Sequence, residues 1–192
     1  VEQKKTLARL GEILADPQRP ILELLEEMLR RPIKDGAAHP VVAAAARQLL
    51  DMAEAERSGV VSTALGYLAL YRDPILARAT EVSDFNIADL IEGARPVSLY
   101  LVVPPEELSR LKALLRLVLN QVLKRLTEIA GRHAETADGR RVLLMLDEFP
   151  ALGRLDFFET SLAFMAGYGV RAFLVAQSLH QIDRAYGANH AI

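Results

Sequence analysis

An unbroken apolar run, residues 142–146, leads directly into two adjacent carboxylates, Asp147 and Glu148. A continuous rather than alternating run is typical of a strand buried on both faces of a parallel sheet. A capping-box pattern then predicts a short helix that begins at Asp156 and ends at Gly167 or Gly169, and a second buried strand is predicted over 170–176. Strand, crossover helix and strand make a βαβ unit, so this part of the chain is predicted to be α/β.

The preceding part of the chain shows only helical periodicity. Apolar residues recur at helical spacing between Pro and Gly breaks, which predicts a small bundle of four helices over 7–14, 21–29, 41–55 and 60–71. A β-rich run at 97–103 and a long helix from about Glu106 to Ala130 come next, with a short helix at 87–92 before them. We therefore assign an all-α domain to 1–82 and an α/β domain to 83–192.

Composition excludes several classes of function. The 23 Lys and Arg residues are balanced by 25 Asp and Glu residues and neither half is strongly basic, which argues against a domain that holds nucleic acid by bulk charge. The absence of Cys removes disulfides, thiolate metal sites and a Cys nucleophile, and the four His residues show no metal-ligand spacing. No apolar segment reaches the roughly 18 to 20 residues of a membrane helix. Because the sequence begins at Val1 rather than Met, we expect it to be a piece of a longer protein.

The acidic pair is the strongest chemical signal. A buried strand that ends in Asp147 and Glu148 places both acids at the carboxyl edge of the sheet, where open α/β sheets bind ligands. In nucleotide hydrolases the first such acid helps to hold Mg²⁺ through water, and the second orients and deprotonates the attacking water. Gln177 ends the next predicted strand and would lie beside the acids if the two strands are neighbours. The alternative is that these polar residues merely end two strands, but their joint occurrence favours a site.

Other side chains give weaker signals. Tyr67, Tyr71 and Arg72 near the end of the predicted bundle could stack on single-stranded DNA, although such tyrosines are more often core residues. Basic residues on the long helix could contact nucleic acid or a partner, but an ordinary solvated helix face is the favoured interpretation; they are Lys112, Arg116, Lys124 and Arg125.

The stretch 143–181, LLMLDEFPALGRLDFFETSLAFMAGYGVRAFLVAQSLHQ, resembles the nucleotide-binding domain of TraG-type coupling proteins of conjugation and type IV secretion. Those proteins are RecA-like hexameric ATPases anchored in the bacterial inner membrane. The resemblance extends to 83–85, 98–104 and 117–121, and the helical half matches in position the all-α domain inserted into that nucleotide-binding domain. It therefore implies a partial RecA-like P-loop NTPase sheet, with Walker B and sensor strands, behind an N-terminal all-α bundle.

By this resemblance, Asp147 and Glu148 are the Walker B pair, with Asp147 holding Mg²⁺ through water beside bound ATP, and Gln177 is the sensor-like glutamine. The chain departs from the family pattern because it contains no G-x-x-x-x-G-K-[ST] loop and no Gly-Lys pair at all. In the family that loop precedes the all-α insertion, so these residues hold half a site. Hexameric ATPases also use an arginine finger from a neighbouring subunit, for which Arg154 and Arg171 are the candidates.

The resemblance implies an ATPase on the cytoplasmic side of the bacterial inner membrane that works as a homo-hexamer. It would recruit a relaxase with single-stranded DNA, or effector proteins, and power their transfer through the inner-membrane components of a type IV secretion channel. Two alternatives remain open from the sequence. The chain could be a non-catalytic helical module that recruits substrates, or its parent could be an FtsK-like DNA translocase.

Overall fold

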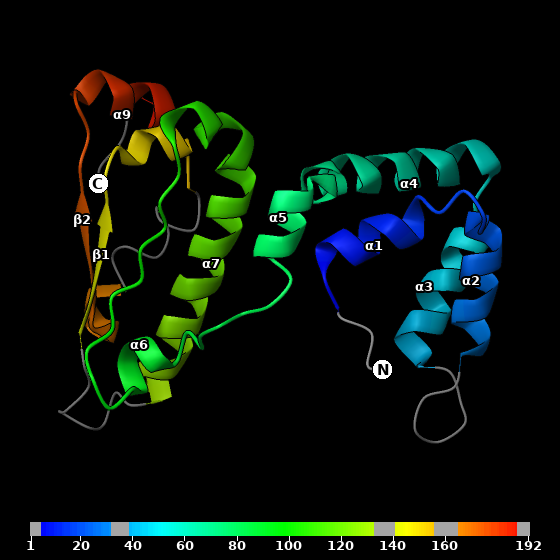
Figure 1. Ribbon diagram of the computed structural model, residues 1–192, viewed down its shortest axis with the longest axis horizontal. Helices are drawn as coiled ribbons and strands as arrows, with labels where there is room; N and C mark the ends of the chain where they lie inside the picture. Colours follow the sequence, from blue (N-terminus) through cyan, green and yellow to red (C-terminus); the bar gives the residue numbers. More distant parts are fainter. Residues whose placement is uncertain (1–4, 32–38, 133–140, 156–164, 188–192) are drawn as a thin grey trace. The chain divides into compact units, whose positions relative to one another are not determined.

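The computed structural model describes residues 5–31, 39–132, 141–155 and 165–187, and the chain divides into two compact units, Val1–Ser83 and Asp84–Ile192. Among its described residues the first unit contains only helices, whereas the second combines helices with a small parallel sheet (Figure 1). This agrees with the α/β class, while a RecA-like sheet with Walker strands stays a prediction. No helix in the described ranges has the length and apolar character needed to cross a membrane.

Two of the helices described in the first unit begin at a residue whose side chain accepts hydrogen bonds from free N–H groups. The Thr6 hydroxyl accepts a hydrogen bond from the Arg9 N–H at 3.0 Å, and the Asp73 carboxylate accepts one from the Ile75 N–H at 2.8 Å. Pro74 suits the first turn of the helix that Asp73 caps. The elements are α1 (Leu7–Leu14), α2 (Ile21–Arg30), α3 (Pro40–Asp51), α4 (Glu54–Leu68), η1 (Ala69–Arg72) and α5 (Pro74–Ala79). Their buried side chains include Leu25, Ala46, Leu68, Tyr71 and Leu76.

The helices predicted over 41–55 and 60–71 imply a break at 57–59. This prediction is wrong, because residues 57–59 lie inside α4. A glycine inside a helix costs about 1 kcal/mol, which tertiary contacts can outweigh. Here the Arg57 guanidinium donates hydrogen bonds to the carbonyl oxygens of Leu50 at 3.4 Å and Met52 at 2.9 Å. These carbonyls belong to the end of α3 and the residue after it, so Arg57 ties the true break at residues 52–53 to the first turn of α4.

The second unit places one long helix against two parallel strands. Its elements are α6 (Asp89–Glu92), η2 (Pro105–Glu107), α7 (Leu108–Arg132), β1 (Val142–Leu146), η3 (Phe149–Leu152), η4 (Ala166–Tyr168), β2 (Val170–Leu174) and α9 (Leu179–Tyr186). Val142 lies opposite Val170 and Leu146 lies opposite Leu174 in a parallel register, which confirms that the two predicted strands are neighbours. The long predicted helix is confirmed as α7. Most of the crossover helix predicted over 156–167 falls outside the described residues.

The β-rich run over 97–103 does not form a strand in the structure. This segment pairs with no strand among the described residues, and its side chains are largely open, with Tyr100 81% and Val102 85% exposed. A preference for strands measures how well side chains fit a pleated, half-buried surface rather than a fixed backbone choice. Without such a surface to join, the β-rich sequence does not become a strand.

The expectation that both sheet faces are buried is also wrong for the described residues. Burial alternates along β1: Leu146 is 9% exposed, whereas Leu143 and Met145 are 61% and 62% exposed. On β2, Phe173 is 54% exposed on the same open face. The reason is that α7 packs on the other face, where its apolar stripe joins β1 and β2 in one core (Figure 1). The buried residues of that stripe are Leu119, Val122, Leu123, Leu126 and Ile129.

Candidate functional site

The carboxyl end of β1 contains a one-residue bulge. The N–H of Val175 donates to the carbonyl of Leu146 at 3.0 Å, and the carbonyl of Val175 accepts from the N–H of Phe149 at 3.1 Å. In a regular parallel ladder that second bond would come from residue 148. The chain therefore carries one additional residue here, so Asp147 and Glu148 are pushed out of the ladder at the end of the sheet.

Glu148 takes up this additional length in an uncommon backbone conformation. Its φ of 50° and ψ of 41° lie in the left-handed region, and no other non-glycine residue in the described part of the chain has a positive φ. Such a conformation costs on the order of 1–2 kcal/mol for a residue with a side chain. Bulges and backbone strain of this kind re-aim a side chain and gather at functional sites. The bulge thus directs the Glu148 carboxylate toward the end of β2.

Two glutamine amides hold the Glu148 carboxylate. Nε2 of Gln177 donates to Oε2 at 2.8 Å, and Nε2 of Gln181 donates to Oε1 at 2.9 Å. The network closes because Oε1 of Gln181 accepts a hydrogen bond from the backbone N–H of Gln177 at 3.0 Å. The structure therefore brings Glu148 and Gln177 together, as the sequence predicts, through a direct hydrogen bond.

Gln181 is the member of this network that the sequence analysis missed. It lies in the first turn of α9, four residues after Gln177, with Ser178 as the N-cap residue between them. A polar side chain in the first turn of a helix that follows a strand is well placed to bond backbone groups near the helix start. The spacing Gln-x-x-x-Gln across a strand-to-helix junction is the signal that could have identified it.

Asp147 is chemically different from its neighbour. Its side chain is exposed and makes no hydrogen bond or ion pair within the described residues, whereas both oxygens of Glu148 are engaged. Within the same ranges no group of three or more acidic, His or Cys side chains could enclose a metal ion. A lone accessible carboxylate fits a Mg²⁺ ion that keeps most of its waters and takes other ligands from phosphates.

The turn after Glu148 is held from two sides. The Tyr186 hydroxyl accepts a hydrogen bond from the Leu155 N–H at 3.3 Å, and the Tyr186 ring packs against Phe149 with centroids 5.8 Å apart.

On the α7 side of this turn, Gly153 has a φ of +69° and a ψ of −170°, and a β-carbon there would meet Nζ of Lys112 at 2.7 Å. Only glycine adopts that backbone conformation readily, so the turn needs Gly153.

The two candidate finger arginines lie in different places. Arg154 is exposed in the turn that follows η3, close in sequence to the acids. Arg171 is exposed near the start of β2, opposite Leu143, and therefore lies toward the amino end of the sheet rather than at its carboxyl edge. The structure does not bring Arg171 to the acidic pair of its own chain. The finger role of either arginine, which would act between subunits, stays a prediction.

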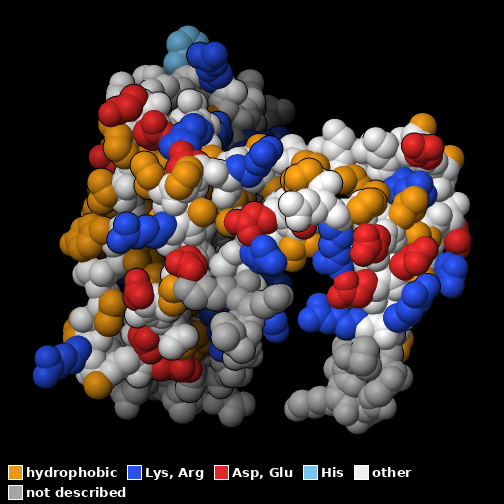
Figure 2. All heavy atoms as spheres, turned by 45° about the vertical axis from the view of Figure 1, so that its right-hand side comes forward, with side chains coloured by type: hydrophobic (Ala, Val, Ile, Leu, Met, Phe, Trp, Pro, Cys, Tyr) orange, Lys and Arg blue, Asp and Glu red, His pale blue; other side chains and the backbone are white. Residues whose placement is uncertain are grey.

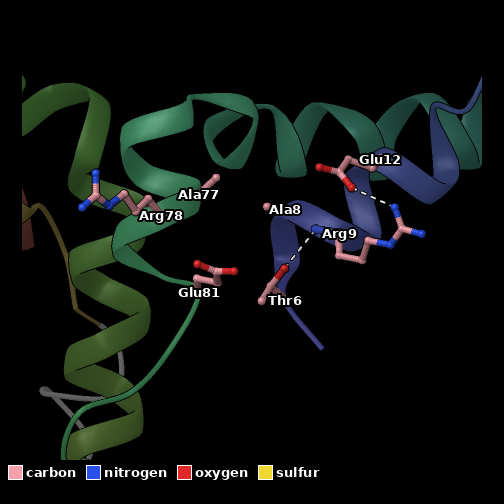
Figure 3. Close-up of a pocket in the computed structure, with 7 residues that line it drawn as sticks. All are labelled: Thr6, Ala8, Arg9, Glu12, Ala77, Arg78 and Glu81. Carbon is pink, nitrogen blue, oxygen red and sulfur yellow. Dashed lines mark hydrogen bonds and ion pairs between the residues drawn. The ribbon is translucent and has the colours of Figure 1, made fainter. Parts of the chain in front are cut away.

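The first unit offers a hollow of about 440 Å³ between the start of α1 and α5 (Figure 3). It is lined by Thr6, Ala8, Arg9, Glu12, Ala77, Arg78 and Glu81. The guanidinium of Arg9 pairs with Glu12 at 2.9 Å and its backbone N–H is bonded to Thr6, so much of the polar wall is already satisfied. The hollow contains none of the residues that the sequence analysis selected.

The aromatic candidates of the first unit have separate environments. Tyr71 is only 7% exposed, and burial raises the pKa of its hydroxyl above the usual 10.0, so this residue belongs to the core. Tyr67 is 81% exposed and Arg72 is also open to solvent. Figure 2 shows Lys and Arg side chains interspersed with Asp and Glu on the visible face, in keeping with the balanced composition.

Comparison with known proteins adds to this geometry. The family model for type IV secretory system conjugative DNA transfer matches residues 1–192. The conjugal transfer protein TraG of Escherichia coli is 41% identical over 197 residues, which cover 97% of this chain and 30% of TraG. Protein VirD4 of Rhizobium rhizogenes is 37% identical over 122 residues, which cover 63% of this chain and 17% of VirD4.

The chain thus spans about 30% of the length of the Escherichia coli relatives that it matches. A TraG of Agrobacterium fabrum is 25% identical over 189 residues, 98% of this chain. The family match covers both the helical unit and the unit that carries Asp147, Glu148 and Gln177. This chain belongs to the type IV secretory system conjugative DNA transfer family.

Proposed function

We propose that this chain is the part of a conjugative coupling ATPase that contributes the catalytic acids and the sensor of the nucleotide site. The observation that carries the proposal is the arrangement at the carboxyl edge of the sheet. There, an accessible Asp147 stands beside a Glu148 whose carboxylate is bonded by Gln177 at 2.8 Å. Membership of the conjugative DNA transfer family supports the same assignment.

Each residue has a distinct role in this proposal. Bound ATP and Mg²⁺ would supply the phosphoanhydride bond that is cleaved and the charge that balances its phosphates. Asp147 would be the residue that holds the ion, through a water molecule. Glu148 accepts a proton from the attacking water, and this is compatible with its present bonds, because a carboxylate has about four acceptor positions and the two amides use two.

Gln177 supplies the link between the nucleotide and the rest of the protein. Its Oε1 makes no hydrogen bond within the described residues, so the amide can still accept from the attacking water while it donates to Glu148. The phosphate-binding G-x-x-x-x-G-K-[ST] loop does not occur in residues 1–192, and we place it in another part of the longer protein. An arginine finger from a neighbouring subunit, with Arg154 or Arg171 as candidates, would complete the site.

The proposed substrates are a relaxase bound to single-stranded DNA, or effector proteins. The protein would pass them, as a homo-hexamer on the cytoplasmic side of the inner membrane, to the inner-membrane components of a type IV secretion channel. The balanced charge of the chain supports recognition of a protein partner at least as well as a grip on DNA. The match to conjugal transfer proteins favours this function over an FtsK-like translocase.

The test is ATP hydrolysis by the full-length protein with Glu148→Gln. We expect turnover to fall by at least about a hundredfold while ATP stays bound, because the change removes the base and leaves the phosphate contacts. Glu106→Gln is the matched control: its side chain is exposed in η2, and it should hydrolyse ATP at the parental rate. Parental turnover by Glu148→Gln would show that Glu148 is not the base.

A second experiment separates the classes of function. A pull-down with relaxase and a duplex-DNA translocation assay are run on the same full-length preparation. Capture of relaxase without movement along duplex DNA supports the coupling protein. Duplex translocation without capture supports an FtsK-like motor, and capture with no ATP hydrolysis at all supports a recruiting module.

A further inference from the structure

We infer that Gln181 is a positioning residue that keeps the Glu148 carboxylate in place while Gln177 changes partners during turnover. This inference rests on the proposed function of Glu148 as the base. It concerns a residue to which neither the sequence pattern nor the family match gives a role. Three features of the hydrogen-bond network carry it.

The first feature is that the Gln181 side chain is fixed at both ends. Its Oε1 accepts from the backbone N–H of Gln177 at 3.0 Å, and its Nε2 donates to Oε1 of Glu148 at 2.9 Å. The side chain is also partly buried. Because one bond goes to the main chain at Gln177, just after β2, the amide cannot turn away from Glu148 without also giving up that bond.

The second feature is the contrast with Gln177. Its side chain is exposed, and the bond from its Nε2 to Glu148 at 2.8 Å is the one hydrogen bond of its side-chain amide within the described residues. Little therefore opposes rotation of the Gln177 amide toward a bound phosphate or water. The bond from Gln181 would keep the Glu148 carboxylate in position during that rotation.

The third feature is the attachment of α9 itself. At the far end of this helix Tyr186 accepts a hydrogen bond from the Leu155 N–H and packs on Phe149. The turn is thus bonded to α9 at its start, through Glu148 and Gln181, and at its end, through Leu155 and Tyr186. These two attachments restrain the backbone from which the Gln181 side chain extends. Glu148 needs this support because its left-handed backbone is strained, and a strained residue keeps its geometry only when its surroundings impose it.

The test compares Gln181→Leu, Gln181→Glu and His180→Leu in the full-length protein. Leu has a similar volume to Gln and removes both hydrogen bonds. Glu keeps an acceptor for the Gln177 N–H but replaces the donor to Glu148 with a like charge. His180→Leu is the matched control, because its side chain is 97% exposed in the same turn of α9. Steady-state ATP hydrolysis, KM for ATP and thermal unfolding are measured for each variant.

If Gln181 positions the base, kcat falls by about tenfold or more in both Gln181 variants, since small misplacements of a catalytic group have large effects on rate. KM for ATP changes by less than about twofold, because uniform binding is untouched. Parental kcat in Gln181→Glu would overturn the inference, since it would mean that Gln181 merely satisfies the Gln177 N–H. A rise in KM with unchanged kcat would overturn it as well.

Glu148→Gln is included so that the proposed function and the role of Gln181 can be refuted independently. If Glu148→Gln hydrolyses ATP at the parental rate, the assignment of the base is wrong and the role of Gln181 is overturned with it. If Glu148→Gln is inactive while both Gln181 variants keep parental kcat and KM, the proposed function stands and only the role of Gln181 is overturned.

Discussion

The amide of Gln177 donates a 2.8 Å hydrogen bond to the carboxylate of Glu148, although the two residues are 29 positions apart in the sequence. Parallel pairing of β1 with β2 brings the ends of their strands to one edge, and the bulge after Leu146 turns the carboxylate toward that amide. The contact joins the proposed base directly to the proposed sensor. Rotation of the Gln177 amide would therefore break one of the hydrogen bonds to the proposed base.

We expect Gln177→Leu to lower ATP turnover of the full-length protein by about ten- to a hundredfold, because the leucine cannot orient a water molecule or bond a phosphate. ATP affinity should change little, since the phosphate-binding loop is unaffected. Steady-state kinetics and nucleotide titration check this expectation. Gln121→Leu, a change of the same kind on the exposed side of α7, should leave both quantities as in the parent. Equal kinetics for Gln177→Leu and the parent would refute the sensor role.

The 192-residue chain by itself should bind ATP weakly or not at all. Most of the affinity for a triphosphate comes from a loop of backbone N–H groups and a lysine, and no Gly-Lys pair occurs in this sequence. Isothermal titration calorimetry with ATP and Mg²⁺ measures this directly. Tight binding by the isolated chain would contradict the idea that it holds half a site.

Gly153→Ala should destabilise the second unit by about 1–3 kcal/mol, because the backbone conformation at φ +69° is strained for any residue with a β-carbon. Lys112 can move its Nζ aside, so Lys112→Ala in the same chain should recover little of the loss. Urea unfolding followed by circular dichroism gives the free energies. Gly167→Ala is the control, since a β-carbon there meets nothing within 4 Å and its φ is not positive. A loss in Gly167→Ala equal to that in Gly153→Ala would exclude the conformational explanation.

Tyr71 should make the first unit less stable in alkali. Burial raises the pKa of its hydroxyl above the usual value of 10.0, so above that pH the unfolded chain loses a proton that the folded chain retains. The contribution is complete below pH 10.0 and is lost as the pH rises through the folded value. Unfolding free energies compared at about pH 8 and about pH 11 should therefore show a smaller alkaline loss in Tyr71→Phe than in the parent. Tyr67→Phe, at a position 81% exposed, should lose as much as the parent does.

Much of the fold could be predicted because local patterns determine it. Helical spacing of apolar residues located α1, α2 and α7, and two apolar runs separated by a helical stretch indicated parallel neighbours. The position of the break between α3 and α4 could not be predicted from these local patterns. Arg57 binds carbonyl groups at the end of the preceding helix, and such a contact is visible only in three dimensions.

The candidate site was predictable in part for the same reason. Residue type and strand position were enough to select Asp147, Glu148 and Gln177. The left-handed backbone of Glu148 was not predictable, because it results from a hydrogen bond that Val175 makes to Phe149 instead of to residue 148. Gln181 was missed because it reaches the site from a helix rather than from a strand end.

The open face of the sheet gives the protein a chemical reporter of its own assembly. Met145 is 62% exposed on that face, so hydrogen peroxide should convert its thioether to the sulfoxide quickly in the isolated chain. Met165, which is 1% exposed, provides an internal reference that should oxidise slowly under the same treatment. Mass spectrometry of the two methionines can then follow any segment or subunit that covers the face, as a fall in the oxidation rate of Met145 alone.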